Sequence, residues 1–160
     1  MSKLTIIRGL PGSGKSELAR EMSKKTGAIV IEPDMFCIHD GEYHYTERDY
    51  QRARRYAAEF VRRTSHLGAD IIYADVLPRY QDVNQIIGNI TTNGYSVDVY
   101  SIQTPKEVSV SRNRHGVYYR DVVRMAEDWD SEYTVIANAA GTDTRHIKEY
   151  IRQWDDPIDG

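Results

Sequence analysis

The sequence holds a single cysteine, Cys37, among its 160 residues. One thiol excludes an intramolecular disulfide and a zinc site made of cysteines alone, and it fits a reducing cytoplasm. Long apolar runs are also missing, since the longest, such as Ile29-Val30-Ile31, have only a few residues. No segment therefore predicts a bilayer-spanning helix, and the first residues lack the order of a signal peptide. We expect a cytoplasmic protein without a membrane partner.

An excess of positive charge is absent as well. Lysine and arginine number 21 against 24 acidic residues, which gives a net charge of −3 at pH 7. This balance argues against a protein that binds nucleic acid by charge alone. The charges are uneven, however, because residues 48–66 hold six arginines and two acids, whereas residues 125–160 hold nine acids and three bases. One face can therefore attract an anion.

Short apolar runs alternate with helical patterns along the chain, and Gly27, Gly68 and Asn93-Gly94 bound several of them. We expect strands at residues 3–8, 28–31, 69–75, 95–102 and 133–137. We expect helices at 15–26, 47–67, 81–92, 105 to 129 with an arginine-rich turn inside, and 142–154, and a loop at 33–45. This alternation predicts an α/β fold with a parallel five-stranded sheet and helices on both faces. Residues 1–160 are expected to form one domain.

The predicted helix at 47–67 is amphipathic. At 100° per residue four of its arginines fall on one stripe and its apolar residues on the opposite one. The arginine stripe consists of Arg48, Arg52, Arg55, Glu59, Arg63 and His66. A solvated face is the ordinary interpretation of such a stripe, and a surface that tracks phosphates is the alternative.

The clearest chemistry lies between the first strand and the first helix. Residues 9–16, GLPGSGKS, match the pattern G-x-x-x-x-G-K-[ST] at every position. The glycines allow a sharp turn that aims backbone N–H groups at phosphates. Lys15 would contact the β- and γ-phosphates, and the Ser16 hydroxyl would bind Mg²⁺. The predicted nucleotide contacts are Gly9, Pro11, Gly12, Ser13, Gly14, Lys15 and Ser16.

The loop does not specify the base of the nucleotide. The GTPase patterns N-K-x-D and D-x-x-G are absent from the chain, which favours ATP. A mechanical ATPase usually carries a large coupled module, for which 160 residues leave no room. A kinase needs only a phosphate cradle, a base, an acceptor pocket and a cationic lid.

Four segments in order resemble the small P-loop kinases related to the kinase domain of phage-type polynucleotide kinase. They are residues 9–16, Asp34-Met35-Phe36, residues 42–46 (EYHYT) and residues 111–117 (SRNRHGV) before a helix with Met125 and Trp129. A weaker fifth match, residues 138–141 (NAAG), is similar to the loop beside the adenine base and adds Asn138 as a nucleotide contact. The resemblance implies a P-loop fold with an arginine-bearing lid at about residues 105–125.

The resemblance also implies roles for two aspartates and two arginines. Asp34 would accept the proton of the acceptor hydroxyl, although an aspartate here can also cap a short helix. Asp75 would touch Mg²⁺ or position the acceptor, or it would serve as a turn residue before Pro78. Arg112 and Arg114 would stabilise the charge of the transferred phosphoryl group.

Departures from the family pattern concern the acceptor. Cys37 stands where polynucleotide kinases have an arginine that holds the substrate phosphate. Residues 75–79 (DVLPR) replace a D-x-x-N-like segment. The lid is one residue shorter than in the two-domain phage enzyme. We expect a stand-alone kinase domain, without the phosphatase domain of the two-domain phage enzyme. With Asp34, the candidate substrate contacts are Tyr43, Tyr45 and Arg79.

The expected acceptor is a hydroxyl of nucleic acid, DNA rather than RNA. It would be a 5′-OH end or a hydroxymethyl group of a modified pyrimidine, as in stand-alone phage kinases that modify DNA. A phage-encoded enzyme in the host cytoplasm fits this interpretation. The first alternative is a kinase of a nucleoside, sugar or antibiotic hydroxyl. The second is a nucleotide-dependent interaction protein without a phosphoryl acceptor.

Overall fold

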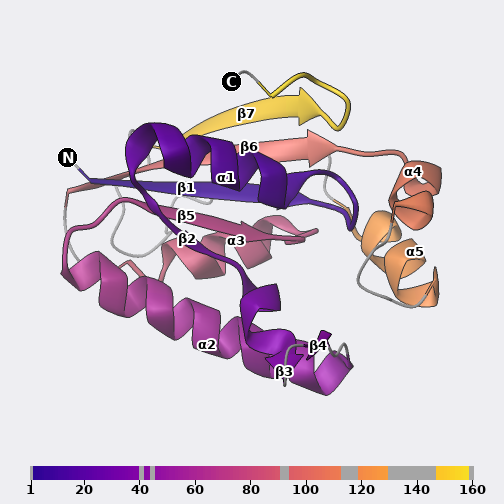
Figure 1. The fold of residues 1–160 in the computed structure, drawn as a ribbon, viewed down its shortest axis with the longest axis horizontal. Helices are drawn as coiled ribbons and strands as arrows, with labels where there is room; N and C mark the ends of the chain where they lie inside the picture. The colour runs from indigo at the N-terminus through magenta and orange to yellow at the C-terminus, as the bar shows by residue number, and fades with distance from the viewer. Residues whose placement is uncertain are drawn as a thin grey trace.

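The computed structural model describes residues 2–39, 42–43, 46–90, 94–112, 119–129 and 147–158. The elements in chain order are β1 (Ser2–Gly9), α1 (Lys15–Thr26), β2 (Ile29–Ile31), the 3₁₀ helix η1 (Pro33–Cys37), β3 (Ile38–His39), β4 (Glu42–Tyr43), α2 (Glu47–His66), β5 (Ile71–Asp75), α3 (Tyr80–Ile87), β6 (Tyr95–Gln103), α4 (Lys106–Ser111), α5 (Tyr119–Glu127) and β7 (Ile147–Gln153). Figure 1 shows their arrangement.

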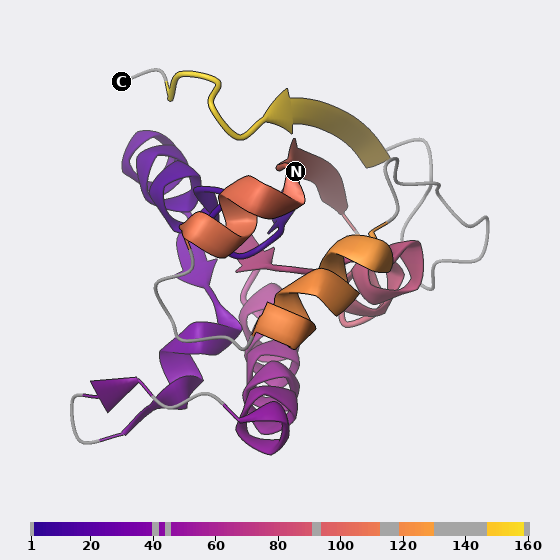
Figure 2. The same ribbon diagram turned by 90° about the vertical axis from the view of Figure 1, so that its right-hand side faces the viewer.

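The five long strands form one parallel sheet in the order β2-β5-β1-β6-β7. This confirms the predicted fold class. The central strand β1 pairs with β5 from Leu4↔Ile71 onward and with β6 from Ser2↔Tyr95 onward. Because all strands run the same way, their carboxyl ends meet at one edge, where ligands bind in open α/β sheets. Figure 2 faces this edge, with α4 and α5 in front of it.

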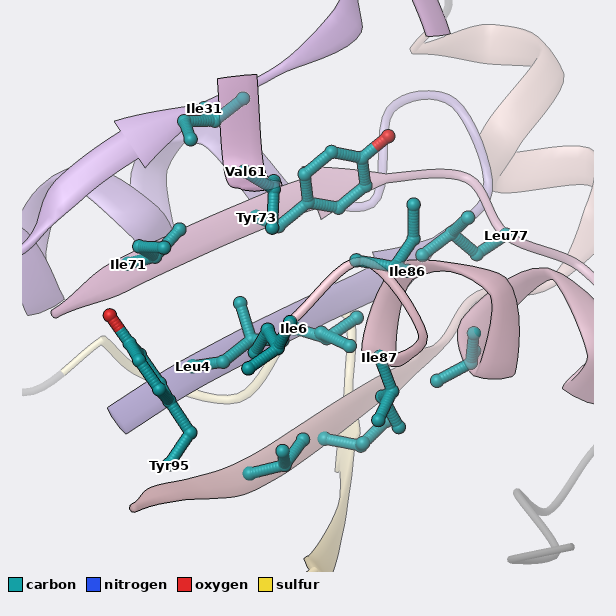
Figure 3. Packing of buried hydrophobic residues seen from close by; sticks show 14 of the residues in the cluster. Leu4, Ile6, Ile31, Val61, Ile71, Tyr73, Leu77, Ile86, Ile87 and Tyr95 are labelled. Carbon is teal, nitrogen blue, oxygen red and sulfur yellow. The ribbon is translucent and has the colours of Figure 1, made fainter. Parts of the chain in front are cut away.

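Helices cover both faces of the sheet. On one face α2 and α3 bury Ala57, Val61 and Ile87 against Leu4 and Ile6 of β1, as Figure 3 shows for most of these side chains. On the other face α1 packs Leu18 and Ala19 against alternate strand residues, namely Ile7, Ile72, Ala74 and Ile102. The alternation along β1 is the period of two that a doubly covered strand requires.

Local signals explain where two helices begin and end. Thr46 accepts a hydrogen bond from the Asp49 N–H at 3.0 Å and so caps the N-terminus of α2. Gly27 ends α1 with φ of +73°, and its N–H donates to the Ser23 carbonyl at 2.8 Å.

Among the described residues no helix is both long and apolar enough to cross a membrane.

The prediction of a helix over residues 142–154 is wrong for 147–153, which form the edge strand β7. Ile147, Tyr150, Ile151 and Trp154 have the i, i+3, i+4, i+7 spacing of a helix. Pairing with β6 overrides that spacing, because Tyr150 lies opposite Tyr100 and the two rings stack at 4.7 Å. The strand expected at 133–137 lies outside the described residues, so β7 supplies the fifth strand.

Two smaller expectations also need correction. The predicted loop at 33–45 contains η1 and the antiparallel pair β3–β4. The predicted helix at 81–92 spans Tyr80–Ile87, with Gly88 as its C-terminal cap. Glycine costs helix stability through backbone entropy, so an end at this position follows from the sequence.

Candidate active site

The glycine-rich loop connects the central strand to a helix N-terminus. β1 ends at Gly9, and α1 begins at Lys15. Gly12 and Gly14 have φ of +77° and +91°, values that a residue with a Cβ atom rarely adopts. The loop therefore has the local conformation that its glycines predicted, at the carboxyl edge of the sheet.

The side chains of this loop fit the phosphates of a nucleotide. Ser13 Oγ is buried and has no hydrogen-bond partner among the described residues, which leaves a donor for a ligand oxygen. Lys15 Nζ donates to the Gly9 and Leu10 carbonyls at 2.9 and 3.1 Å, so the ammonium group lies on the loop itself. These groups and the N-terminus of α1 would hold the phosphates of Mg²⁺–ATP, which supplies the transferable phosphoryl group when it is bound.

Four carboxylates act on Lys15, and the smallest effect is that of Glu17 in the same helix. Burial lowers the pKa of Lys15, and the charges of Asp34, Asp75 and Glu32, in that order of size, oppose this effect. The site therefore joins residues from α1, from the segment after β2 and from the end of β5. The sequence predicted Asp34 and Asp75 at this place but not Glu32.

Asp34 lies in η1, directly after β2. The Met35 N–H donates to the Glu32 carbonyl at 3.0 Å, which closes the turn. The side chain of Asp34 is half-buried. An acid near a lysine at this edge has the chemistry of a base for an acceptor hydroxyl.

Glu32 lies between β2 and η1 and is half-buried. The Ser16 hydroxyl, at the start of α1, is among the groups that act on its pKa. Burial raises the pKa of Glu32, while the Ser16 hydroxyl and the charges of Lys15 and Arg20 lower it. The sequence signal that could have identified Glu32 is the position of this acid directly after the apolar run 28–31.

Asp75 is buried at the end of β5 and accepts several hydrogen bonds. The Tyr50 hydroxyl and the Val76 N–H donate to Oδ1, the latter at 2.8 Å, and the Tyr73 hydroxyl lies 3.4 Å from Oδ2. Arg54 Nε lies 3.2 Å from Oδ2 and forms an ion pair. Burial raises the pKa of Asp75, whereas Arg54, Tyr50 and Val76 lower it.

Tyr50 and Arg54 are site residues that the sequence analysis did not identify. Both lie on α2, four residues apart, so they share one side of that helix. Burial and the charge of Asp75 raise the pKa of Tyr50 well above its usual value, so the phenol keeps its proton and donates it. The sequence does hold a signal for Arg54: at 100° per residue it lies on the same side of the helix as apolar residues such as Val61, away from most of the other arginines.

Arg112 directly follows α4 and lies against the glycine-rich loop. A Cβ atom on Gly12 would come within 2.7 Å of the Arg112 Cβ. Ser109 Oγ donates to the Pro11 carbonyl at 2.6 Å. The guanidinium of Arg112 lies 5.5 Å from the centroid of the Trp154 ring. The base of the predicted lid therefore contacts the loop, and the catalytic role of Arg112 remains a prediction.

The remaining candidates are less central or lie outside the described residues. Arg79 forms an ion pair with Asp128 at 2.9 Å and caps α3. Tyr43 lies in β4, where it pairs with Ile38. The structure does not describe Tyr45, Arg114 and Asn138, so their predicted roles remain predictions.

Arg8 is a further residue that sequence reasoning missed. It is fully buried on β1, one residue before the loop. It donates to the Leu77 and Pro78 carbonyls, each at 2.9 Å, and to Ser101 Oγ at 3.1 Å. Its guanidinium lies 3.9 Å from the centroid of the Trp129 ring. Arg8 thus joins the strand before the loop to the segment after β5 and to the end of the lid.

Among the described residues no group of three or more His, Cys, Asp or Glu side chains could hold a metal ion. A magnesium ion that is bound together with ATP needs no such group, because phosphate oxygens, water and one hydroxyl suffice. Ser16 supplies that hydroxyl at the start of α1. The donor set therefore fits a magnesium ion that arrives with its nucleotide.

Comparison with known proteins places this site in a family. The sequence model described as Zeta toxin matches residues 2–153. The uncharacterized protein PM0531 of Pasteurella multocida (strain Pm70) is 27% identical over 139 residues, which are 78% of this chain and 75% of that protein.

Solved structures show the same fold. A sugar kinase from Janibacter sp. HTCC2649 has a TM-score of 0.64 at 16% identity, over 99% of this chain and 88% of that one. A chain of the Pnkp1/Rnl/Hen1 RNA repair complex has a TM-score of 0.59 at 18% identity, over 81% of this chain and 46% of that one. The family match and these neighbours identify a P-loop phosphotransferase.

Proposed function

Since the chain belongs to the Zeta toxin family, whose sequence model spans residues 2–153, we propose that it is a kinase that uses ATP and Mg²⁺ to phosphorylate a hydroxyl group of nucleic acid. One observation carries the kinase assignment. Asp34 in η1 follows β2 and Lys15 follows β1, so both stand at the carboxyl edge of the parallel sheet, and the charge of Asp34 raises the pKa of Lys15. The proposed base therefore lies beside the residue that contacts the transferred phosphate in this loop type.

Asp34 is the proposed base for the proton transfer. The acceptor oxygen forms a bond to the γ-phosphorus atom, the bond to the leaving ADP oxygen breaks, and Asp34 takes the hydroxyl proton. Lys15 stabilises the negative charge on the phosphates, and Arg112, next to the loop, supplies a planar cation for the phosphoryl oxygens. Asp75 fixes α2 against β5 at the same edge through its contacts with Tyr50 and Arg54.

An exposed surface beside η1 supports nucleic acid as the acceptor. Met35 on η1 and Tyr56 and Phe60 on α2 are 52%, 58% and 47% exposed. Arg52 and Arg55 are exposed on the same helix. Tyr56 lies near Phe36 of η1, with 6.2 Å between ring centroids, so this surface adjoins the turn that carries Asp34. Aromatic faces next to arginines are the chemistry that stacks bases and follows a phosphate backbone.

The test is phosphate transfer from γ-labelled ATP to a panel of acceptors. The panel contains 5′-OH DNA and RNA oligonucleotides, duplex DNA with hydroxymethylated pyrimidines, nucleosides and sugars. We expect label on an oligonucleotide and a KM for it that rises steeply with salt. Nuclease digestion then assigns the phosphate to the sugar end or to the base. Label only on small molecules, or only as free phosphate, would contradict the nucleic-acid assignment.

Two variants and a control separate binding from transfer. Lys15→Ala should abolish ATP binding, because it removes the cation on the loop. Asp34→Asn should keep ATP binding and lose most of the transfer. Glu59→Gln, which changes an exposed carboxylate paired with Arg62 and Arg63, should change neither. Normal transfer by Asp34→Asn would show that another group is the base.

A small-molecule hydroxyl is the second candidate acceptor. Several arginines that could track a phosphate backbone are bound to carboxylates of the chain itself: Arg54 to Asp75, Arg62 to Glu59, and Arg79 to Asp128. The Janibacter sugar kinase also matches over nearly the whole of both chains. This candidate predicts a KM for the acceptor that salt does not change.

A further inference from the structure

Trp129, two residues after the end of α5, is held by side chains from two neighbouring strands. The guanidinium carbon of Arg8 on β1 lies 3.9 Å from the centroid of the indole ring. The indole N–H donates to Oε1 of Gln103 at the end of β6, with 3.2 Å between the two atoms. One face and one edge of the ring are therefore fixed by residues near the carboxyl ends of β1 and β6.

Arg8 is a rigid partner for this ring. Its side chain is completely buried, and its N–H groups donate to the Leu77 and Pro78 carbonyls and to Ser101 Oγ. These hydrogen bonds run in the plane of the guanidinium, so stacking on a ring uses a flat face that they do not need. A cation over an indole ring is a strong contact when the cation is removed from water, as Arg8 is.

The other end of the same segment is tied to the nucleotide loop. Ser109 Oγ on α4 donates to the Pro11 carbonyl at 2.6 Å, and Arg112 lies against Gly12. The helices α4 and α5 contact each other in front of the carboxyl edge of the sheet (Figure 2). One tie lets a pair of helices pivot, whereas a second tie at the far end, here Trp129, fixes the direction of the pair.

An ion pair at the same end of α5 contributes less. Arg79 Nη2 lies 2.9 Å from Asp128 Oδ2, but the two side chains are 51% and 34% exposed. Exposed pairs of this kind add little to stability, because water and salt screen them. The stacked contact of Trp129 is therefore the one that holds the end of α5.

We propose that Trp129 is a positioning residue for phosphoryl transfer: stacked on Arg8, it holds α5, and through α5 the helix α4 and Arg112, in place beside the nucleotide loop. This inference rests on the proposed kinase function and adds to it a residue that acts through another one. Arg112 is the proposed cation for the phosphoryl oxygens, and the charge that it stabilises depends on its distance from them. A misplacement of about 1 Å at such a group costs about a hundredfold in rate.

The first test measures the position of α5 without nucleotide or acceptor. Nitroxide labels are attached to Lys24→Cys in α1 and Glu127→Cys in α5, both exposed positions, and double electron–electron resonance gives the distribution of distances between them. Cys37 is buried and stays unlabelled. Trp129→Leu should broaden or shift this distribution, because leucine is apolar but has no π face for Arg8. Trp129→Phe keeps a ring on the guanidinium and should retain the wild-type distribution.

The second test separates kcat from KM in the unlabelled variants, at a temperature at which urea denaturation shows each of them to be folded. Trp129→Leu should lower kcat by about tenfold to a hundredfold. It should leave the KM for ATP within about twofold of the wild-type value, since the nucleotide loop itself is unchanged. Trp129→Phe should recover most of the kcat. If Trp129→Leu does not fold, Trp129→Met replaces it, because methionine also lacks a π face.

Two variants at the same end of α5 serve as matched controls. Glu127→Gln changes an exposed acid on the helix, and Asp128→Asn removes only the exposed ion pair with Arg79. Both should keep the wild-type kcat and distance distribution.

Wild-type kcat and an unchanged distance distribution in Trp129→Leu would overturn the inference. Equal losses in Trp129→Leu and Trp129→Phe would also overturn it, because they would assign the effect to the indole N–H and Gln103 instead of the stacked ring. Failure of the proposed function gives a different pattern. No acceptor in the panel would then be phosphorylated, while the distance distribution and the rate of ATP hydrolysis to water would still respond to Trp129→Leu and not to Trp129→Phe.

Discussion

Arg54 on α2 and Asp75 at the end of β5 form an ion pair beside the nucleotide loop, with 3.2 Å between Nε and Oδ2. The pair connects the helix that carries the exposed arginines to the carboxyl edge of the sheet. Tyr50, one turn earlier on α2, donates to the same carboxylate. The position of α2 relative to the site therefore depends on buried polar contacts as well as on its apolar face.

Replacing Arg54 by methionine should destabilise the protein strongly. The change leaves the buried Asp75 carboxylate without its cation, which typically costs about 3–5 kcal/mol. The pKa of Asp75 is already raised by burial, and Arg54 lowers it, so the variant has a still higher folded-state pKa. Stability from a raised carboxyl pKa is present at low pH and lost as pH rises through that pKa.

The difference in unfolding free energy between wild type and Arg54→Met should therefore be larger at pH 8 than at pH 5, as measured by urea denaturation. Arg55→Met is the control, because Arg55 is the exposed neighbour on the same helix; it should stay within about 0.5 kcal/mol of the wild type. A pH-independent loss in Arg54→Met would contradict the role given to the charge of Asp75.

Gly12→Ala should weaken ATP binding and Gly27→Ala should not, although the two glycines have similar backbone conformations. Gly12 has φ of +77° and Gly27 φ of +73°, so each alanine incurs about 1–2 kcal/mol of left-handed strain. A Cβ atom on Gly12 would also come within 3.0 Å of the Arg112 carbonyl oxygen, whereas nothing lies within 4 Å of one on Gly27. Titration with a fluorescent ATP analogue should show lost affinity for Gly12→Ala alone. Equal affinities would mean that the contact between α4 and the loop is not needed for binding.

Arg8→Lys should lower the unfolding free energy by about 2–4 kcal/mol, since an ammonium group cannot reach both carbonyls and Ser101 at once or stack flat on Trp129. The tryptophan emission should also shift, because Trp129 loses the cation on its ring. Chemical denaturation followed by fluorescence measures both effects. The exposed Arg55→Lys should change neither, and a stable Arg8→Lys protein would show that charge alone suffices at this position.

Cys37 should react slowly with thiol reagents in the native protein. It is buried, and burial together with the charge of Asp34 raises the pKa of its thiol to about 11. The thiolate, which is the reactive form, therefore becomes appreciable only as pH approaches that value. A colorimetric thiol assay at pH 8 should give a slow native reaction and one rapid thiol per chain after denaturation. Rapid native reaction would indicate that η1 opens readily.

Much of the site follows from short-range patterns in the sequence. The loop at residues 9–16 is local, so its glycines, Lys15 and Ser16 could be predicted without knowing the fold. Asp34 and Asp75 could be predicted because each follows a strand in a parallel sheet, which places both at one edge.

Partners that meet across the fold could not be predicted in this way. Tyr50 and Arg54 depend on which side of α2 faces the sheet edge, and Glu32 depends on how the chain turns between β2 and η1. Arg8 is a charged residue inside a strand whose acceptors come from β5–α3 and β6, far along the chain. The strand β7 was hidden because a solvent-exposed edge strand imposes little burial pattern of its own, so a helical spacing of apolar residues could persist there.

The order of the sheet also affects how fast the chain folds. β1 is hydrogen-bonded to β5 and β6, two strands that come dozens of residues later in the chain. Closing such long loops costs chain entropy before any pairing compensates for it, so topologies of this kind fold slowly. On a ribosome β1 and its glycine-rich loop gain β5 after Asp75 has been made, and their second neighbour β6 only after Gln103. ATP binding should accordingly be a late event in the maturation of the chain.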